Sequence, residues 1–78
     1  MTTTPKVEPI YGAISSRVRY MRETLGVTQE ELAKRIGLTR TSLVNFENGN
    51  QRCMLHTIED MARALGTTPK QLLKGLWT

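Results

Sequence analysis

Four residues near the middle of the chain carry side chains that can read the edges of DNA base pairs. The guanidinium of Arg40 can donate two hydrogen bonds to guanine O6 and N7, and the amide of Asn45 can bond adenine N6 and N7. The methyl groups of Thr41 and Val44 can pack on the methyl group of thymine. The alternative is an ordinary solvated helix surface, on which a single exposed valine such as Val44 needs no special explanation.

Other groupings of reactive side chains do not assemble a catalytic or metal site. Cys53 and His56 form a C-x-x-H pattern, but a structural zinc site needs four ligands and the chain has no second cysteine or histidine. Catalysis by the Cys53 thiol would need a base and an orienting group around it. The carboxylates at 30–31 and at 59–60 are adjacent, so they do not face one another on a helix. We therefore expect no enzyme activity, no metal and no cofactor.

The base-reading candidates lie on the second of two short predicted helices. Thr28 followed by Glu31 forms a capping box, in which the hydroxyl and the carboxylate each accept a backbone N–H of the first turn. Gly37 supplies the left-handed residue that ends this helix, and Thr39 caps the next one. Two short helices joined by so tight a turn must cross steeply, which predicts a helix-turn-helix.

Apolar residues at helical spacing predict an all-α, compact five-helix domain, with helices at about 9–25, 28–36, 39–48, 54–65 and 68–75. Residues 1–8 are expected to form a flexible arm, and residues 9–78 one domain. Arg17 and Arg19 lie on other faces of the first helix, where a solvated position is the ordinary expectation. The expected inward residues are Ile14, Val18, Met21, Leu25, Leu32, Ala33, Ile36, Leu43, Phe46, Leu55, Ile58, Met61, Ala62, Leu65, Leu72, Leu73 and Leu76.

Length and charge narrow the class of protein. A chain of 78 residues makes one small domain, which buries only about 60% of its unfolded surface. The formal net charge of +4 favours a polyanionic partner. One cysteine excludes an internal disulfide framework, and no apolar run approaches the ~20 residues that span a bilayer. We expect a cytoplasmic protein with no membrane segment.

The stretch LGVTQEELAKRIGLTRTSL, followed by FENG, resembles the DNA-binding domains of the lambda repressor/Cro family, also called the xenobiotic-response-element (XRE) family. Within that family it is most similar to the lambdoid phage repressors. The likeness extends through ISSRVR upstream and MARALG downstream, and covers roughly residues 13–75. The chain departs from the family pattern at Cys53, where a proline is frequent, and at Met54, where a Ser or Thr cap is frequent.

The resemblance implies contacts with the DNA backbone. Gln29 matches a glutamine that bonds a phosphate, assisted by its backbone amide and by the positive end of the helix. Ser42 can reach a phosphate or bond its own helix backbone. In the loop after the recognition helix the family again meets the backbone, and Asn48 can instead cap that helix. The implied phosphate contacts in this loop are Asn48, Asn50, Gln51 and Arg52.

The resemblance also implies one structural ion pair. In the family, an arginine at the place of Arg22 pairs with a glutamate at the end of the recognition helix, where Glu47 stands. Such a pair would be partly buried and would lock the first helix against the recognition helix. In the N-terminal arm Lys6 is the only basic residue, which leaves minor-groove contact, dimer contact and disorder as alternatives.

One recognition helix covers only a few base pairs, so specific binding requires a dimer on a pseudo-palindromic operator. Leu55, Leu76 and Trp77 are candidates for the dimer interface, although Trp77 can equally fold onto its own core. The resemblance therefore implies a homodimeric transcriptional regulator, of the repressor or restriction-modification controller type. The alternative is an antitoxin or adaptor, whose main partner is another protein such as a toxin or polymerase and for which DNA is secondary.

Overall fold

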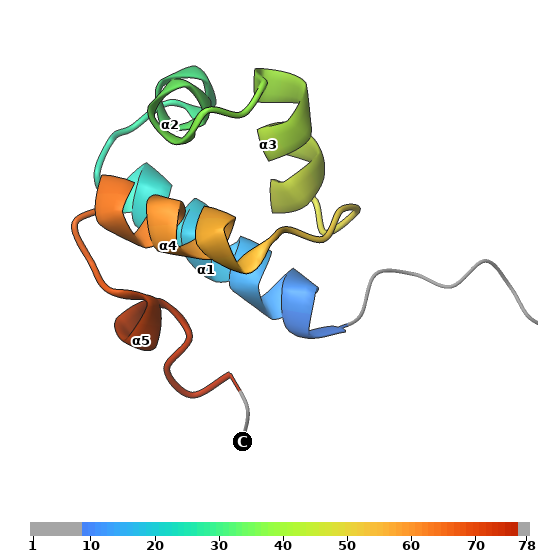
Figure 1. Ribbon diagram of the computed structural model, residues 1–78, viewed down its shortest axis with the longest axis vertical. Coiled ribbons are helices and arrows are strands. Elements are labelled where there is room, and N and C mark those ends of the chain that lie inside the picture. Colours follow the sequence, from blue (N-terminus) through green and yellow to red (C-terminus); the bar gives the residue numbers. More distant parts are fainter. Residues whose placement is uncertain (1–8, 77–78) are drawn as a thin grey trace, which may run out of the picture.

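The computed structural model describes residues 9–76, which fold into five helices without strands (Figure 1). The predicted arm and Trp77 lie outside this range. The all-α, five-helix fold is confirmed. The predicted ranges of the first four helices included their capping residues, and without those residues they match the observed helices. The helices are α1 (Pro9–Thr24), α2 (Gln29–Ile36), α3 (Arg40–Glu47), α4 (Leu55–Ala64) and α5 (Pro69–Leu72).

Local capping sets the bounds of α2 and α3. The Thr28 hydroxyl accepts the Glu31 N–H at 3.0 Å, and the Glu31 carboxylate accepts the Thr28 N–H at 3.0 Å, which completes the predicted capping box. Gly37 ends α2 with φ 75°, in the left-handed region that glycine adopts without strain. The Thr39 hydroxyl then accepts the Ser42 N–H at 3.0 Å and begins α3. The two helices cross steeply across this turn (Figure 1).

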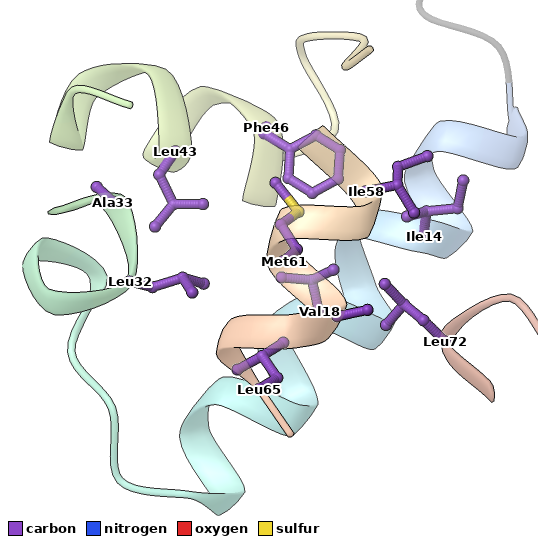
Figure 2. Close-up of a cluster of buried hydrophobic side chains, with 11 residues drawn as sticks. Ile14, Val18, Leu32, Ala33, Leu43, Phe46, Ile58, Met61, Leu65 and Leu72 are labelled. Atoms are coloured by element: carbon purple, nitrogen blue, oxygen red, sulfur yellow. The ribbon is translucent and has the colours of Figure 1, made fainter. Parts of the chain in front are cut away.

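One apolar core holds the helix pair on the rest of the molecule. Figure 2 shows Leu32 of α2 and Phe46 of α3 pointing toward Met61 of α4 and Val18 of α1, and all four side chains are essentially inaccessible to solvent. Burying a side chain of this size contributes about 1.5–3 kcal/mol each. The buried apolar residues are Ile14, Val18, Leu32, Ala33, Leu43, Phe46, Ile58, Met61, Ala62, Leu65 and Leu72.

Two predicted core residues are exposed. Leu25 has 55% of its surface exposed, because α1 ends at Thr24 and the chain then turns through Gly26 at φ 72°. Leu55 is 81% exposed, because it is the first residue of α4 and no described element covers that turn. The expectation that these two leucines face inward is wrong.

Arg17 of α1 holds the short helix α5 by hydrogen bonds, so its side chain is not solely in contact with solvent. Its guanidinium donates to the backbone carbonyls of Gln71, Leu72 and Lys74, at 3.4, 3.2 and 3.1 Å. These carbonyls lie at a helix C-terminus, where intrahelical donors run out. The predicted helix 68–75 is thus shorter, ends at Leu72, and is fixed at its end by a side chain from α1.

Within residues 9–76, no helix combines the length and the apolar character that a bilayer crossing requires. The pair α2–α3 lies at one end of the molecule and α5 at the other, with α1 and α4 between them (Figure 1). Among the described helices, none lies over the outer side of the pair α2–α3 (Figure 1).

Candidate nucleic-acid interface

The outer face of α3 carries the residues proposed to read bases. Arg40, Thr41 and Asn45 are exposed, and Val44 is half-buried. Opposite them, Leu43 and Phe46 are buried in the core and fix the rotation of the helix, as Figure 2 shows. The sequence predicted this division between outer and inner faces, and the structure brings the three polar side chains to the surface together.

The N-termini of α2 and α3 border one concave surface. Its lining includes Arg22, Thr28, Gln29, Glu30 and Arg40. Each helix N-terminus carries a partial positive charge and N–H groups without intrahelical acceptors. With the guanidinium of Arg40 beside them, this surface can accept an anion such as a phosphate, and Glu30 is the lining residue that opposes one.

Behind that surface, Arg22 and Glu47 form a buried ion pair between α1 and α3. Arg22 Nε donates to Glu47 Oε2 at 2.7 Å, and Arg22 Nη2 donates to Glu47 Oε1 at 2.9 Å. Only 9% and 1% of the two side chains are exposed. The hydrogen bond to Glu47, followed by the attraction of that carboxylate, raises the pKa of Arg22 against the opposing effect of burial. Nη1 donates to the Val27 carbonyl at 2.8 Å and completes the fork.

Gln29 is joined to the same carboxylate, a contact that the sequence did not reveal. Its Nε2 donates to Glu47 Oε1 at 3.1 Å, across 18 residues of the chain. The side chain is half-buried and also lines the concave surface. Gln29 therefore stands between the buried ion pair and the position expected for a phosphate.

The loop after α3 presents the remaining polar side chains. The backbone N–H groups of Asn48, Gly49 and Asn50 bond carbonyls of α3 at 2.9–3.0 Å, which closes the helix end. Gly49 has φ 77°, and a Cβ at this position would lie 4.0 Å from the Gly12 backbone of α1, so the loop sits against that helix. Three of the candidate side chains are exposed and Gln51 is half-buried; the exposed ones are Asn48, Asn50 and Arg52.

Ser42 lies in the first turn of α3. Its backbone N–H is taken by the Thr39 cap, and its side chain is half-buried in the first turn of α3. Asn48 stands at the C-cap of α3, where its backbone N–H donates to the Val44 carbonyl at 3.0 Å.

Cys53 and His56 lie elsewhere, in a hollow between α3 and α4 whose lining includes Phe46 and Met61. Burial raises the pKa of the Cys53 thiol to about 11, so the thiol stays protonated near neutral pH and is a poor nucleophile. Among residues 9–76 there is no cluster of three or more His, Cys, Asp and Glu side chains that could hold a metal ion.

The two dimer candidates within the described residues, Leu55 and Leu76, differ in exposure. Leu55 is highly exposed at the start of α4, next to Met54, which is 68% exposed. Leu76 is half-buried and packs against the core beyond α5. Leu55 belongs to the first turn of α4, whereas Leu76 follows α5 in the chain.

Comparison with known proteins gives a consistent picture. The family model described as helix-turn-helix matches residues 18–72. An uncharacterised HTH-type transcriptional regulator of Methanothermobacter thermautotrophicus is 45% identical over 49 residues, which are 63% of this chain and 71% of that protein. The control protein C.BamHI of Bacillus amyloliquefaciens is 31% identical over 70 residues, covering 90% of this chain and 84% of the relative.

A solved structure shares both fold and sequence. The restriction-modification controller protein C.AhdI of Aeromonas hydrophila superposes with a TM-score of 0.75 at 32% identity. The match covers 80% of this chain and 94% of the controller.

Proposed function

The chain belongs to the helix-turn-helix transcriptional regulators of the lambda repressor/Cro (XRE) type, and we propose that it binds a specific pseudo-palindromic operator as a homodimer. The observation that carries this proposal is the division of α3 into two faces. Arg40, Thr41 and Asn45 are exposed together, while Leu43 and Phe46 anchor the helix in the core. A helix built in this way can enter the major groove without losing its packing.

Recognition of the sequence is assigned to α3. Arg40 bonds guanine O6 and N7, Asn45 bonds adenine, and Thr41 and Val44 contact thymine methyl groups. Each good bidentate pair supplies about 1–3 kcal/mol of discrimination against a wrong base.

Contacts with the phosphate backbone set the register of α3 in the groove. They come from both sides of that helix: from Gln29 at the start of α2, and from the loop after α3. The proposed loop residues are Asn48, Asn50, Gln51 and Arg52, with Ser42 as a further candidate on α3 itself.

The homodimer follows from the size of the site. One domain presents a single recognition helix, so a specific operator requires two copies with their α3 helices about 34–36 Å apart, one turn of the duplex. Leu55, Leu76 and Trp77 remain the proposed interface, Trp77 lying outside the described residues. The similarity to C.BamHI and C.AhdI supports a controller type, with a phage-type repressor as the other form of the same cytoplasmic function.

A second function is favoured by the exposed apolar pair at the start of α4. Met54 and Leu55 expose 68% and 81% of their surfaces, and a protein partner could cover them. In that case the chain would be an antitoxin or adaptor that binds a toxin or polymerase, with DNA secondary. The exposed polar face of α3 argues for DNA as the main partner.

Fluorescence anisotropy with a duplex from the region upstream of the gene and a scrambled duplex, at two salt concentrations, tests the proposal. We expect tight binding to the upstream duplex that persists when salt is added. Binding to the scrambled duplex should be lost at the higher salt concentration. Equal and salt-sensitive binding to both duplexes would contradict sequence recognition there. Sedimentation of the free protein and the complex measures the dimer separately, and a complex with one protein copy per operator would contradict it.

A further inference from the structure

The Glu47 carboxylate serves three donors from two other helices. Oε2 accepts Arg22 Nε, and Oε1 accepts both Arg22 Nη2 and Gln29 Nε2. Since 1% of the Glu47 side chain is exposed, water does not compete for these oxygens. The carboxylate at the end of the recognition helix thereby holds the first residue of α2 as well as α1.

The bond to Glu47 uses one of the two N–H groups of the Gln29 amide. The other N–H belongs to a half-buried side chain that lines the concave surface between the α2 and α3 N-termini. A glutamine with no such bond samples several rotamers and must lose that freedom when it binds a ligand. A glutamine held on one side is already oriented, which is the general advantage of preorganisation.

We propose that Glu47 is a positioning residue for DNA binding, which holds the Gln29 amide so that its second N–H donates to a phosphate of the DNA backbone. The proposal rests on the proposed function, because it takes DNA as the ligand. Glu47 does not touch the DNA itself. Because Glu47 belongs to the recognition helix α3, it links the orientation of that helix to the contact that Gln29 of α2 makes with a DNA phosphate. One buried carboxylate thus positions both groups.

A double-mutant cycle tests this coupling. Gln29→Ala is compared in the wild-type chain and in the Glu47→Gln chain, with binding measured on a short duplex at low salt. Glu47→Gln keeps the side-chain shape but leaves one acceptor oxygen for three donors, so the bond to Gln29 or part of the Arg22 fork is lost. Any general effect of Glu47→Gln, including the uncompensated charge of Arg22, cancels in the cycle.

The expected result is about a tenfold loss of affinity from Gln29→Ala in the wild-type chain, the factor for one hydrogen bond to a charged group. In the Glu47→Gln chain the same substitution should cost less than about twofold. Equal factors in both chains, or no loss in the wild-type chain, would overturn the proposal. Because a phosphate contact is independent of sequence, the cycle is also run on a scrambled duplex. If the protein shows no preference between the two duplexes, the proposed sequence-specific function fails, but the coupling between Glu47 and Gln29 can still be measured on either duplex.

A second measurement needs no variant that could unfold. Nitrogen-15 relaxation reports the mobility of the Gln29 side-chain amide in the free protein, with the exposed Gln71 on α5 as the matched control. The Gln29 amide should be restricted, with an order parameter approaching the ~0.85 of a rigid backbone, and Gln71 should fall below about 0.6. Equal mobility of the two amides would overturn the positioning role.

Discussion

Arg22 on α1 and Glu47 at the end of α3 form a bidentate, buried ion pair, with N–O distances of 2.7 and 2.9 Å. The planar guanidinium matches the carboxylate, so both bonds are charge-assisted. The pair joins α3, the helix proposed to read bases, to α1, the longest helix among the described residues. Its loss would leave the buried Arg22 charge with only the exposed Glu23 carboxylate, 3.9 Å away, so removing Glu47 should be strongly destabilising.

Glu47→Ala should destabilise the protein by about 3–5 kcal/mol, because the Arg22 charge then stays buried without its partner. For a domain of this size each kcal/mol lowers the melting temperature by roughly 4–8 °C. Thermal unfolding followed by circular dichroism measures the loss. The control is Arg19→Ala, which removes an ion pair with Glu23 whose side chains are 54% and 57% exposed and should change stability by less than about 1 kcal/mol. Equal melting temperatures for Glu47→Ala and wild type would show that the buried pair does not stabilise the fold.

Arg40→Ala should cost about 1–3 kcal/mol of binding to the true operator and relax the preference at one base pair. The reason is the loss of two hydrogen bonds to a guanine edge. Binding to a set of duplexes with single base changes measures the preference at each position. Arg40→Lys serves as the matched variant, since it keeps the charge but not the fork. A loss of the same size on every duplex would count against base reading by Arg40.

Arg52→Ala should weaken binding to all sequences and flatten the slope of log affinity against log salt by about one unit. A phosphate contact releases a counterion, whereas a base contact does not. Titrations at several salt concentrations give the slope. The control is Arg63→Ala, because Arg63 is exposed on α4 and pairs with Asp60, outside the helix-turn-helix. An unchanged slope for Arg52→Ala would refute its phosphate role.

Arg17→Ala should loosen α5 from the domain while the other helices keep their protection. The guanidinium donates to three carbonyls at the end of α5, and alanine leaves them without that donor. Hydrogen exchange measures this through the amides of Leu72 and Leu73, which bond Thr68 and Pro69. These amides should exchange faster than in the wild type, and Leu43 of α3 should not change. Uniform acceleration across all helices would indicate global destabilisation instead.

Cys53 should make stability depend on pH in the alkaline range. Burial raises the pKa of its thiol to about 11 from a usual value of 9.0, so the folded state holds the proton more tightly than the unfolded state. The resulting stabilisation is fully present below the unfolded value and is lost as pH rises through the folded value. Urea unfolding of wild type and Cys53→Ala across this range isolates the effect. The free energy of unfolding of the wild type, measured relative to that of Cys53→Ala, should decrease as pH rises through this range. A difference that does not change with pH would contradict the predicted role of the Cys53 thiol.

Local interactions within a few residues could be predicted from the sequence. The Thr28–Glu31 capping box, the left-handed turn at Gly37 and the Thr39 cap all join residues three or fewer apart or depend on one backbone conformation. Their residue types are sufficient to specify them. The same holds for the outward and inward faces of α3, since helical periodicity alone separates Arg40 from Leu43.

The family resemblance supplied what periodicity could not, namely the pairing of Arg22 with Glu47 across 25 residues. It did not supply the bond from Gln29 to the same carboxylate. A glutamine in the first turn of a helix has many possible partners, and its actual one depends on how α2 and α3 are placed.

The tertiary structure alone decided which helix ends are covered. Leu25 and Leu55 satisfy the apolar spacing of their helices, yet both are exposed because burial depends on a neighbouring element being present at that turn. Arg17 has the opposite outcome: its charge predicts solvent, but the C-terminal carbonyls of α5, 54 to 57 residues away, bind it. Local hydrogen bonding and periodicity are properties of the sequence, whereas the acceptors and apolar surfaces that meet across the core exist only once the helices have packed.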